Sequence, residues 1–233
     1  MPDLHARLDS VRERLARAAR RAGRDPTEVT LVAISKTFPA ADIRAAHESG
    51  QVHFGENKVQ EALHKMGEVS DLALRWHLVG HLQSNKGRKA AEHFDIIHSV
   101  HNASLVTILD DAARTAGRRI ELLIQVDLAK EPTKYGAGID DLLGIFEAGR
   151  NCAAATIIGL MVLPPASEDP EDARPHFVAL RRLRDSLLAK GVAAPRLAQL
   201  SMGMSHDFEV AVEEGATMVR VGSAIFGSRP PNG

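Results

Sequence analysis

Val29-Thr30-Leu31-Val32-Ala33-Ile34-Ser35-Lys36 begins the pattern that decides the fold of this 233-residue chain. A short apolar run rich in β-branched residues predicts a buried strand. Because Lys36 ends the run, we expect its side chain to stand on an apolar floor and to face a cavity. Desolvation lowers the pKa of a lysine, and a neutral amine can form a Schiff base with an aldehyde. The alternative is a lysine whose stem covers apolar surface while its ammonium group reaches water.

Strand and helix patterns alternate along the rest of the chain. Such alternation implies parallel pairing with right-handed crossovers, and eight units predict an α/β fold, a (β/α)8 TIM barrel. We expect one domain over residues 1–233, with an amphipathic helix over 3–22 added before the barrel. A doubly wound open sheet is the alternative, but neither G-x-G-x-x-G after a strand nor G-x-x-x-x-G-K-[ST] is present. The expected strands are 29–36, 52–56, 75–80, 95–100, 120–127, 156–163, 197–202 and 217–222; the expected helices between them are 40–49, 57–68, 84–92, 102–116, 139–149, 170–190 and 206–214; the longest loops are expected over 129–138 and 164–170.

The composition is that of an ordinary globular protein. Hydrophobic residues make up 44% of the chain and the formal net charge is -1, so nothing favours a nucleic-acid or membrane partner. Cys152 is the only cysteine, which excludes an internal disulfide and is typical of a cytoplasmic protein. The N-terminal segment lacks the apolar core of a signal peptide, and no apolar run is long enough to span a bilayer. We interpret the arginines of the first helix as a solvated face.

Polar residues gather where the expected strands end. In a (β/α)8 barrel, sites form at the carboxyl ends of the strands and in the loops that follow. This convergence predicts a site at that face of the barrel. The residues concerned are Lys36, Glu56, Asn57, His81, His101, Ser201, Gly203, Gly222 and Ser223.

The last two strands carry glycine and serine in a pattern that suits an anion. The segments are Ser201–Ser205 and Arg220–Gly227. Glycine lets backbone N–H groups approach an anion closely, serine adds a hydroxyl, and these two loops often bind phosphate in barrels. The alternative is that the glycines serve only tight turns.

Arg220 alternates with Val219 and Val221, so we expect it to point into the barrel. A buried guanidinium needs an acceptor. That acceptor is either a carboxylate or the heterocyclic nitrogen of a bound cofactor.

The histidines do not form a metal motif. His77 and His81 are four residues apart, which on a strand spans ~13 Å, too far for one zinc ion. His98 and His101 lack an acid or thiolate at a recognisable spacing. We therefore expect no metal site, and no nucleophilic role for Cys152, which has no evident base nearby.

Five segments together resemble the pyridoxal phosphate homeostasis proteins, the family related to the N-terminal barrel of alanine racemase. The resemblance extends from the first helix to Arg229 and implies the fold-type III barrel, with pyridoxal 5'-phosphate (PLP) as cofactor. Two positions depart from the family pattern: Lys58 stands where a tyrosine is frequent, and the C-terminus reads Arg229–Gly233. The five segments are Ile34–Thr37, Phe54–Asn57, Trp76–Gln83, Leu200–Ser205 and Met218–Gly227.

The resemblance also implies roles for individual residues. Lys36 would hold the cofactor as a Schiff base, Arg220 would face the pyridine nitrogen, and Asn57 would line the pocket beside the ring. The residues that would cradle the phosphate are Ser201, Gly203, Gly222 and Ser223, and Met202 completes the expected cofactor-binding set.

Family members act in vitamin B6 and in amino- and keto-acid homeostasis without an established reaction, and this chain is expected to do the same. A cation opposite the ring nitrogen disfavours its protonation and makes the ring a weaker electron sink. Racemases of this fold add an acid/base from a second domain, which we do not find here. Tyr135 is interpreted as an ordinary loop residue, with a substitute acid/base as the alternative. We therefore expect no catalytic residues. The first hypothesis is a monomeric PLP carrier that serves PLP-dependent apoenzymes or free amino acids. A small racemase or lyase, or a Schiff-base aldolase, is the alternative.

Overall fold

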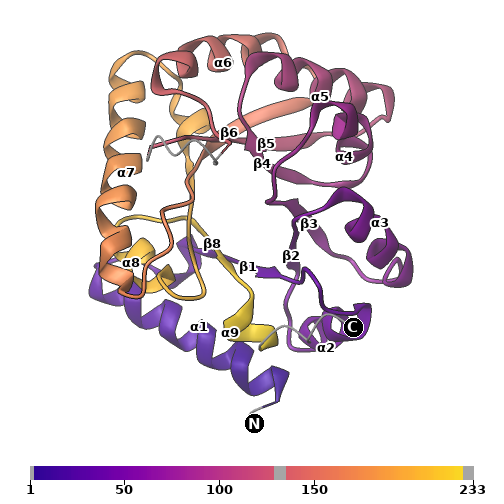
Figure 1. The fold of residues 1–233 in the computed structure, drawn as a ribbon, viewed down its shortest axis with the longest axis vertical. Coiled ribbons are helices and arrows are strands. Elements are labelled where there is room, and N and C mark those ends of the chain that lie inside the picture. The colour runs from indigo at the N-terminus through magenta and orange to yellow at the C-terminus, as the bar shows by residue number, and fades with distance from the viewer. Residues whose placement is uncertain (1–2, 129–134, 228–233) are drawn as a thin grey trace.

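The computed structural model describes residues 3–128 and 135–227. Eight parallel strands close into a barrel in the order of the sequence, with helices around it (Figure 1), which confirms the predicted (β/α)8 fold. Residues 129–134 of the expected loop 129–138, and the C-terminal Arg229–Gly233, lie outside the described residues. The strands are β1 (Thr30–Ile34), β2 (His53–Glu56), β3 (Arg75–Leu78), β4 (Ile96–Val100), β5 (Ile120–Gln125), β6 (Ala155–Met161), β7 (Gln199–Met204) and β8 (Met218–Val221).

The helices follow the expected order, with one addition after β8. That helix, α9, has four residues, too few to produce a visible period in the sequence. Three expected helices begin later than predicted, because 3-10 turns over Ser84–Lys86, Ile139–Asp141 and Pro170–Ala173 precede them. The α-helices are α1 (Leu4–Arg21), α2 (Ala40–Glu48), α3 (Val59–Glu68), α4 (Gly87–His93), α5 (Ala103–Thr115), α6 (Leu142–Ala148), α7 (Arg174–Ala189), α8 (Phe208–Glu213) and α9 (Ser223–Phe226).

The position of β7 differs from the prediction of 197–202 by two residues. Residues Ala194–Leu197 form a 3-10 turn that contains proline, so the strand starts only at Gln199. At its other end Met204 still pairs with Arg220 of β8. The loop after β7 therefore begins at Ser205.

Alternate residues along each strand point to opposite sides, either toward the helices or into the barrel. The larger core lies between the strands and the helices and contains Phe54, Phe177 and Phe208. Inside the barrel the apolar side chains form two small clusters, and polar side chains occupy part of the remaining space. The period of two that defines a strand thus assigns each residue to the barrel interior or to the helical layer.

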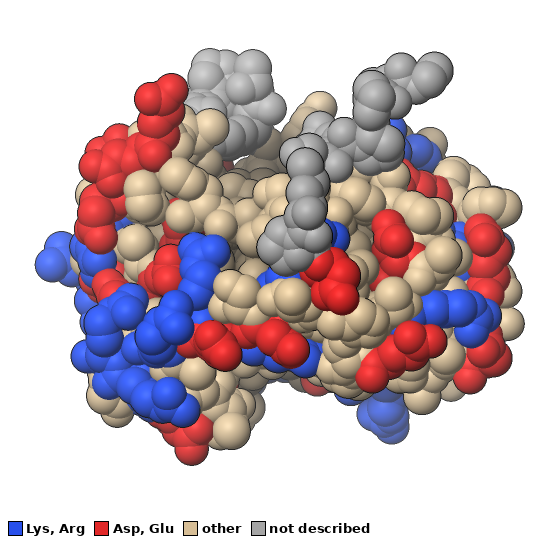
Figure 2. All heavy atoms as spheres, turned by 90° about the horizontal axis from the view of Figure 1, so that it is seen from below, with Lys and Arg blue, Asp and Glu red and all other residues tan. Residues whose placement is uncertain are grey.

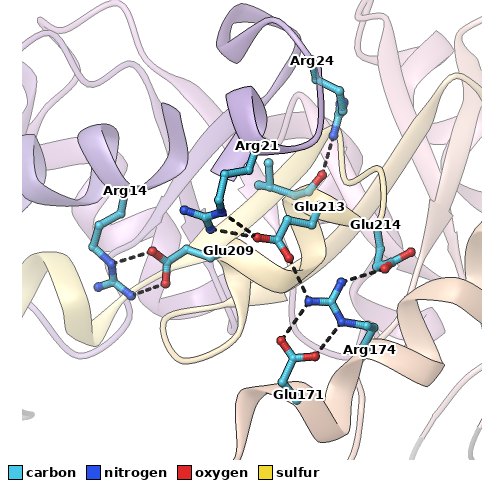
Figure 3. Close-up of polar contacts among 9 residues, drawn as sticks. Arg14, Arg21, Arg24, Glu171, Arg174, Glu209, Glu213 and Glu214 are labelled. Carbon is cyan, nitrogen blue, oxygen red and sulfur yellow. Dashed lines mark hydrogen bonds and ion pairs between the residues drawn. The ribbon is translucent and has the colours of Figure 1, made fainter. Parts of the chain in front are cut away.

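Helix α1 takes a place in the helical ring. Its apolar face, which includes Leu8, Val11 and Leu15, is buried, and the helix contacts α8, α9 and α2 along one edge of the barrel (Figure 1). Its arginines are not only a solvated face, as the sequence led us to expect, because several of them contact other elements. Arg14 pairs with a glutamate of α8 at 2.9 Å and Arg21 pairs with another at 2.8 Å (Figure 3). Helical spacing alone cannot reveal partners on another element.

Charges of both signs share the surface over this edge of the molecule. Figure 2 shows Lys and Arg side chains gathered toward the side on which α7 lies in Figure 1, with Asp and Glu side chains between and around them. Adjacent opposite charges limit the field that such a surface projects. None of the helices described is long and apolar enough to cross a membrane.

Candidate functional site

A cavity of about 660 Å³ opens at the carboxyl ends of the strands. This is a size typical of small-molecule sites, and the location is the one at which barrels carry their sites. Five of the eight predicted cofactor-binding residues line it together: Lys36, Asn57, Arg220, Gly222 and Ser223; His81, also expected at this face, lines it as well.

Lys36 lies two residues beyond β1 on the cavity wall and is half-buried. The next residue, Thr37, has a φ of 68°, a left-handed conformation that β-branched residues rarely adopt and that costs about 1–3 kcal/mol. The Thr37 amide donates to Glu61 Oε1 at 2.6 Å. A strained turn held by a specific hydrogen bond thus carries the lysine.

A buried ionic cluster lies behind this turn, on the side facing α3. The ammonium of Lys65 donates to Glu56 Oε1 at 2.7 Å, to Glu61 Oε1 at 2.9 Å and to the Ser35 carbonyl at 2.7 Å. Ser35 Oγ also donates to Glu56 Oε1 at 2.7 Å. Burial raises the pKa of Glu56, and Lys65 opposes that rise. All three ammonium protons are used, so the cluster fixes the backbone on both sides of Lys36.

Two backbone amides converge on one oxygen at the end of β8. The N–H groups of Gly222 and Ala224 donate to Ser205 Oγ at 3.0 and 3.4 Å, and Ser205 lines the cavity beside Gly222 and Ser223. Converging amides form the kind of nest that binds an anion oxygen. Sequence reasoning quoted Ser205 but did not select it, because the strand before it was expected to end two residues too early.

The other three predicted residues of β7 are buried away from the cavity wall. The hydroxyl of Ser201 lies 2.8 Å from His98 Nδ1 and accepts from Arg220 Nη1 at 2.6 Å. Met202 belongs to the core between strands and helices. Gly203 has a φ of 92°, and a Cβ there would press on α8. Its conformation therefore serves the close approach of α8 to the strand.

Arg220 points into the barrel, as the alternation along β8 predicted, and is 3% exposed. Besides Ser201, its guanidinium donates from Nη2 to the Val162 carbonyl at 2.9 Å. Burial lowers the pKa of Arg220 to about 10. Both acceptors are neutral, and the side chain lines the cavity, so a charge without a direct carboxylate partner among the described residues faces that space.

A chain of three histidines inside the barrel was missed by sequence reasoning. His53 Nδ1 lies 2.9 Å from His77 Nε2, and His77 Nδ1 lies 2.8 Å from His98 Nε2. The three residues come from consecutive strands, so no short spacing reveals them; the available signal was an interior-facing histidine on each of β2, β3 and β4. Among the residues described, no three His, Cys, Asp or Glu side chains are placed to hold a metal.

The rim of the cavity carries a stacked pair of rings. His81 lies on Tyr135 with ring centroids 3.6 Å apart and planes at 14°. Burial, with His101 nearby, lowers the pKa of His81. Lys58 is exposed at the N-terminus of α3 and does not line the cavity.

Comparison with known proteins places this geometry in a family. The family model described as alanine racemase, N-terminal domain, matches residues 6–230. The pyridoxal phosphate homeostasis protein of Aquifex aeolicus is 42% identical over 224 residues, which cover 96% of this chain and 97% of that protein. The protein of the same name from Pseudomonas aeruginosa is 42% identical over 229 residues, which cover 98% and 97%.

Solved structures agree with these relatives. PipY of Synechococcus elongatus with PLP bound matches with a TM-score of 0.84 at 42% identity, over 97% of this chain and 100% of that one. Alanine racemase of Clostridium difficile matches with a TM-score of 0.74 over 98% of this chain and 57% of the racemase; at 12% identity this shows the shared fold alone. The chain belongs to the alanine racemase N-terminal domain family and, within it, to the pyridoxal phosphate homeostasis proteins.

Proposed function

We propose that this protein binds PLP in the cavity and acts in intracellular vitamin B6 and amino- and keto-acid homeostasis. The observation that carries the proposal is the presence of Lys36, Arg220 and the converging amides around Ser205 on one cavity wall. PLP supplies an electrophilic aldehyde, a phosphate and a ring nitrogen when it is bound. An amine, a set of amide donors and a guanidinium are the matching groups. The residues present therefore fit the cofactor.

Each residue has a defined part in this proposal. Lys36 binds the cofactor covalently through Nζ, and its turn is held in place by the ionic cluster of Lys65. Gly222 and Ser223 hold the phosphate, and we add Ser205 to the predicted set. Asn57 lines the wall beside the ring. Ser201, Met202 and Gly203 belong to the strand that precedes Ser205 and so position it. Ser201 also accepts a hydrogen bond from Arg220.

Arg220 favours a carrier over an enzyme. Its guanidinium donates hydrogen bonds and keeps its positive charge, so it leaves a facing ring nitrogen as an acceptor and disfavours protonation there. This reduces the ring's capacity to stabilise a carbanion. The protein then holds a reactive aldehyde and passes it to PLP-dependent apoenzymes or free amino acids, as a monomer in the cytoplasm.

A small racemase or lyase is the second candidate. One observation favours it: His81 and Tyr135 lie together on the cavity wall, and the lowered pKa of His81 keeps a neutral imidazole there. A neutral imidazole can accept a proton. Exchange of the α-proton of amino acids in heavy water separates the candidates, since a carrier gives no turnover above that of free PLP.

Borohydride reduction followed by peptide mass spectrometry tests the cofactor assignment. The wild-type protein is expected to be yellow and to carry the reduced cofactor on Lys36. Lys36→Ala should lose the colour and the adduct, whereas Lys58→Ala, an exposed lysine outside the cavity wall, should keep both. A colourless protein that takes up no added PLP, or an adduct on another lysine alone, would overturn the proposal.

A further inference from the structure

A continuous chain of hydrogen bonds crosses the barrel from the cavity toward the opposite end. It runs from Arg220 through Ser201, His98 and His77 to His53, over links of 2.6, 2.8, 2.8 and 2.9 Å. His53 is the first residue of β2, at the amino-terminal end of the strands, and is half-buried. The intervening members are fully buried.

The histidines in this chain are neutral. Burial, together with the charge of Arg220, lowers the pKa of His98 to about 3. Burial and the neighbouring His98 and His53 hold the pKa of His77 well below its ordinary value. A neutral imidazole has one N–H donor and one acceptor nitrogen, so each ring can receive a hydrogen bond on one side and pass one on from the other.

The chain can run in two senses, and Arg220 selects one of them. A guanidinium only donates, so Ser201 Oγ accepts on that side. If His98 also donated to Ser201 Oγ, the hydroxyl proton would be buried without an acceptor, because the described residues give this hydroxyl no partner besides these two. An unmet buried donor costs about 1–3 kcal/mol. Ser201 therefore donates to His98 Nδ1.

This sense determines the tautomer of every ring. His98 has a bare Nδ1 and donates from Nε2 to His77, which likewise donates from Nε2 to His53. Each donor points away from the cavity. Reversal would require all three imidazoles and the hydroxyl to change together.

We propose that His98, supported by His77 and His53, is a positioning residue for Arg220. By accepting a hydrogen bond from the Ser201 hydroxyl, it turns the hydroxyl lone pairs toward the guanidinium, which fixes the charged group on the cavity wall without a carboxylate in direct contact. The identity of the ligand that Arg220 faces rests on the proposed function. The direction of the chain is a property of the protein alone.

Nitrogen NMR of the histidine side chains in the cofactor-free protein tests the direction. His98 and His77 should both be neutral, with the proton on Nε2, from pH 8 down to pH 5. In Ser201→Ala, His98 loses its donor and should show mixed tautomers, and the Arg220 guanidinium resonances should report faster rotation. An Nδ1–H tautomer or an imidazolium at His98 in the wild type overturns the proposal, and this readout does not depend on PLP.

Binding measurements on the loaded protein test the positioning. Loss of one hydrogen bond to a charged group corresponds to an affinity about tenfold weaker or more. His98→Leu should bind PLP that much more weakly and shift the pH profile of the bound cofactor's absorbance. His98→Asn, which offers an acceptor oxygen near Nδ1, should recover part of both effects. His64→Leu, an exposed histidine on α3, is the control. Wild-type affinity and pH profile in both His98→Leu and Ser201→Ala overturn the positioning role, whereas absence of PLP binding in the wild type overturns only the proposed function.

Discussion

Arg220 and Arg174 show two ways in which this fold uses an arginine. Arg220 is buried inside the barrel with a hydroxyl and a carbonyl as acceptors, and burial lowers its pKa to about 10. Arg174, at the start of α7, pairs with Glu171, Glu213 and Glu214 at 2.6 to 2.8 Å, and these glutamates raise its pKa (Figure 3). In this comparison, carboxylates surround Arg174, which joins α7 to α8. Neutral acceptors surround Arg220, whose charge faces the cavity.

Lys65 is buried like Arg220 and paired with carboxylates like Arg174, so it separates the effect of burial from the effect of ion pairing. Its side chain is 7% exposed, close to the burial of Arg220, yet two glutamates accept from it, as glutamates do from Arg174. If pairing determines what a cation contributes to stability, Lys65 should behave as a stronger version of Arg174. Its buried setting excludes the water that would otherwise screen the pair.

The largest effect is expected for Lys65→Met. Removing one partner of a buried ion pair leaves an uncompensated charge on Glu56 and typically costs about 3–5 kcal/mol. Urea denaturation of the cofactor-free protein measures the loss. The double variant Lys65→Met/Glu56→Leu should recover much of it, because apolar replacement of a whole buried pair is often tolerated. A loss below about 1 kcal/mol in the single variant would contradict the importance of pairing.

The second effect is a loss of stability in mild acid that comes from the barrel interior. The folded-state pKa of His98 is about 3 against an ordinary 6.5, so the unfolded chain takes up a proton before the folded one does. The contribution of His98 is therefore complete above pH 6.5 and declines as the pH falls toward 3. A single group of this kind accounts for about 2–3 kcal/mol between pH 6.5 and about 4.5. Denaturation midpoints at pH 7, 6 and 5 measure it.

Two controls assign this pH dependence. Arg174 and Arg21 lower the pKa of Glu213, so Glu213→Gln should leave the slope above pH 5 unchanged. The raised pKa of Glu56 acts in the opposite sense, because its folded carboxyl takes up a proton at a higher pH than the unfolded one does. Glu56→Gln removes this opposing contribution and is the second control, and a stability that stays flat from pH 6.5 to pH 5 in that variant would sink the idea of neutral buried histidines.

The third effect is a moderate one at the surface. Arg174→Met should cost about 1–2 kcal/mol, because three ion pairs of partial exposure are lost and each contributes less than a buried pair. The loss should shrink at high salt, which screens exposed charges. Arg182→Met, an exposed arginine of the same helix, is the matched control. An equal loss at low and high salt would mean that Arg174 acts through packing.

Local patterns in the sequence were sufficient for the barrel and for much of the cavity. The apolar run before Lys36 and the alternation of Arg220 with two valines each depend on a period of two, which a strand enforces. Parallel closure then brings the strand ends together. This is why Lys36, Asn57, Arg220, Gly222 and Ser223 could be predicted to meet and lie on one wall.

Contacts between distant strands could not be predicted in this way. The choice between Ser201 and Ser205 as a cavity residue depends on where β7 ends. Because the predicted end of β7 was two residues too early, Ser201 of the barrel interior was selected in place of Ser205, which lines the cavity. The partners of Lys65 and the histidine chain depend on the stagger between neighbouring strands and on the approach of α3. Single-sequence patterns carry no information about either.

The smallest losses of stability are expected for Arg14 and Arg21, the two arginines through which α1 pairs with glutamates of α8. Arg14 makes a bidentate pair with Glu209 and lies 4.8 Å over the Phe208 ring, so Arg14→Ala should cost about 1 kcal/mol. The Arg21 side chain is 54% exposed and shares Glu213 with Arg174, so Arg21→Ala should cost about 0.3 kcal/mol or less. A double-mutant cycle with each glutamate isolates the pair from its surroundings. Glu213 still pairs with Arg174 when Arg21 is removed. The coupling energy between Arg21 and Glu213 should therefore rise in an Arg174→Met background. An unchanged coupling energy there would mean that the two arginines bind Glu213 independently.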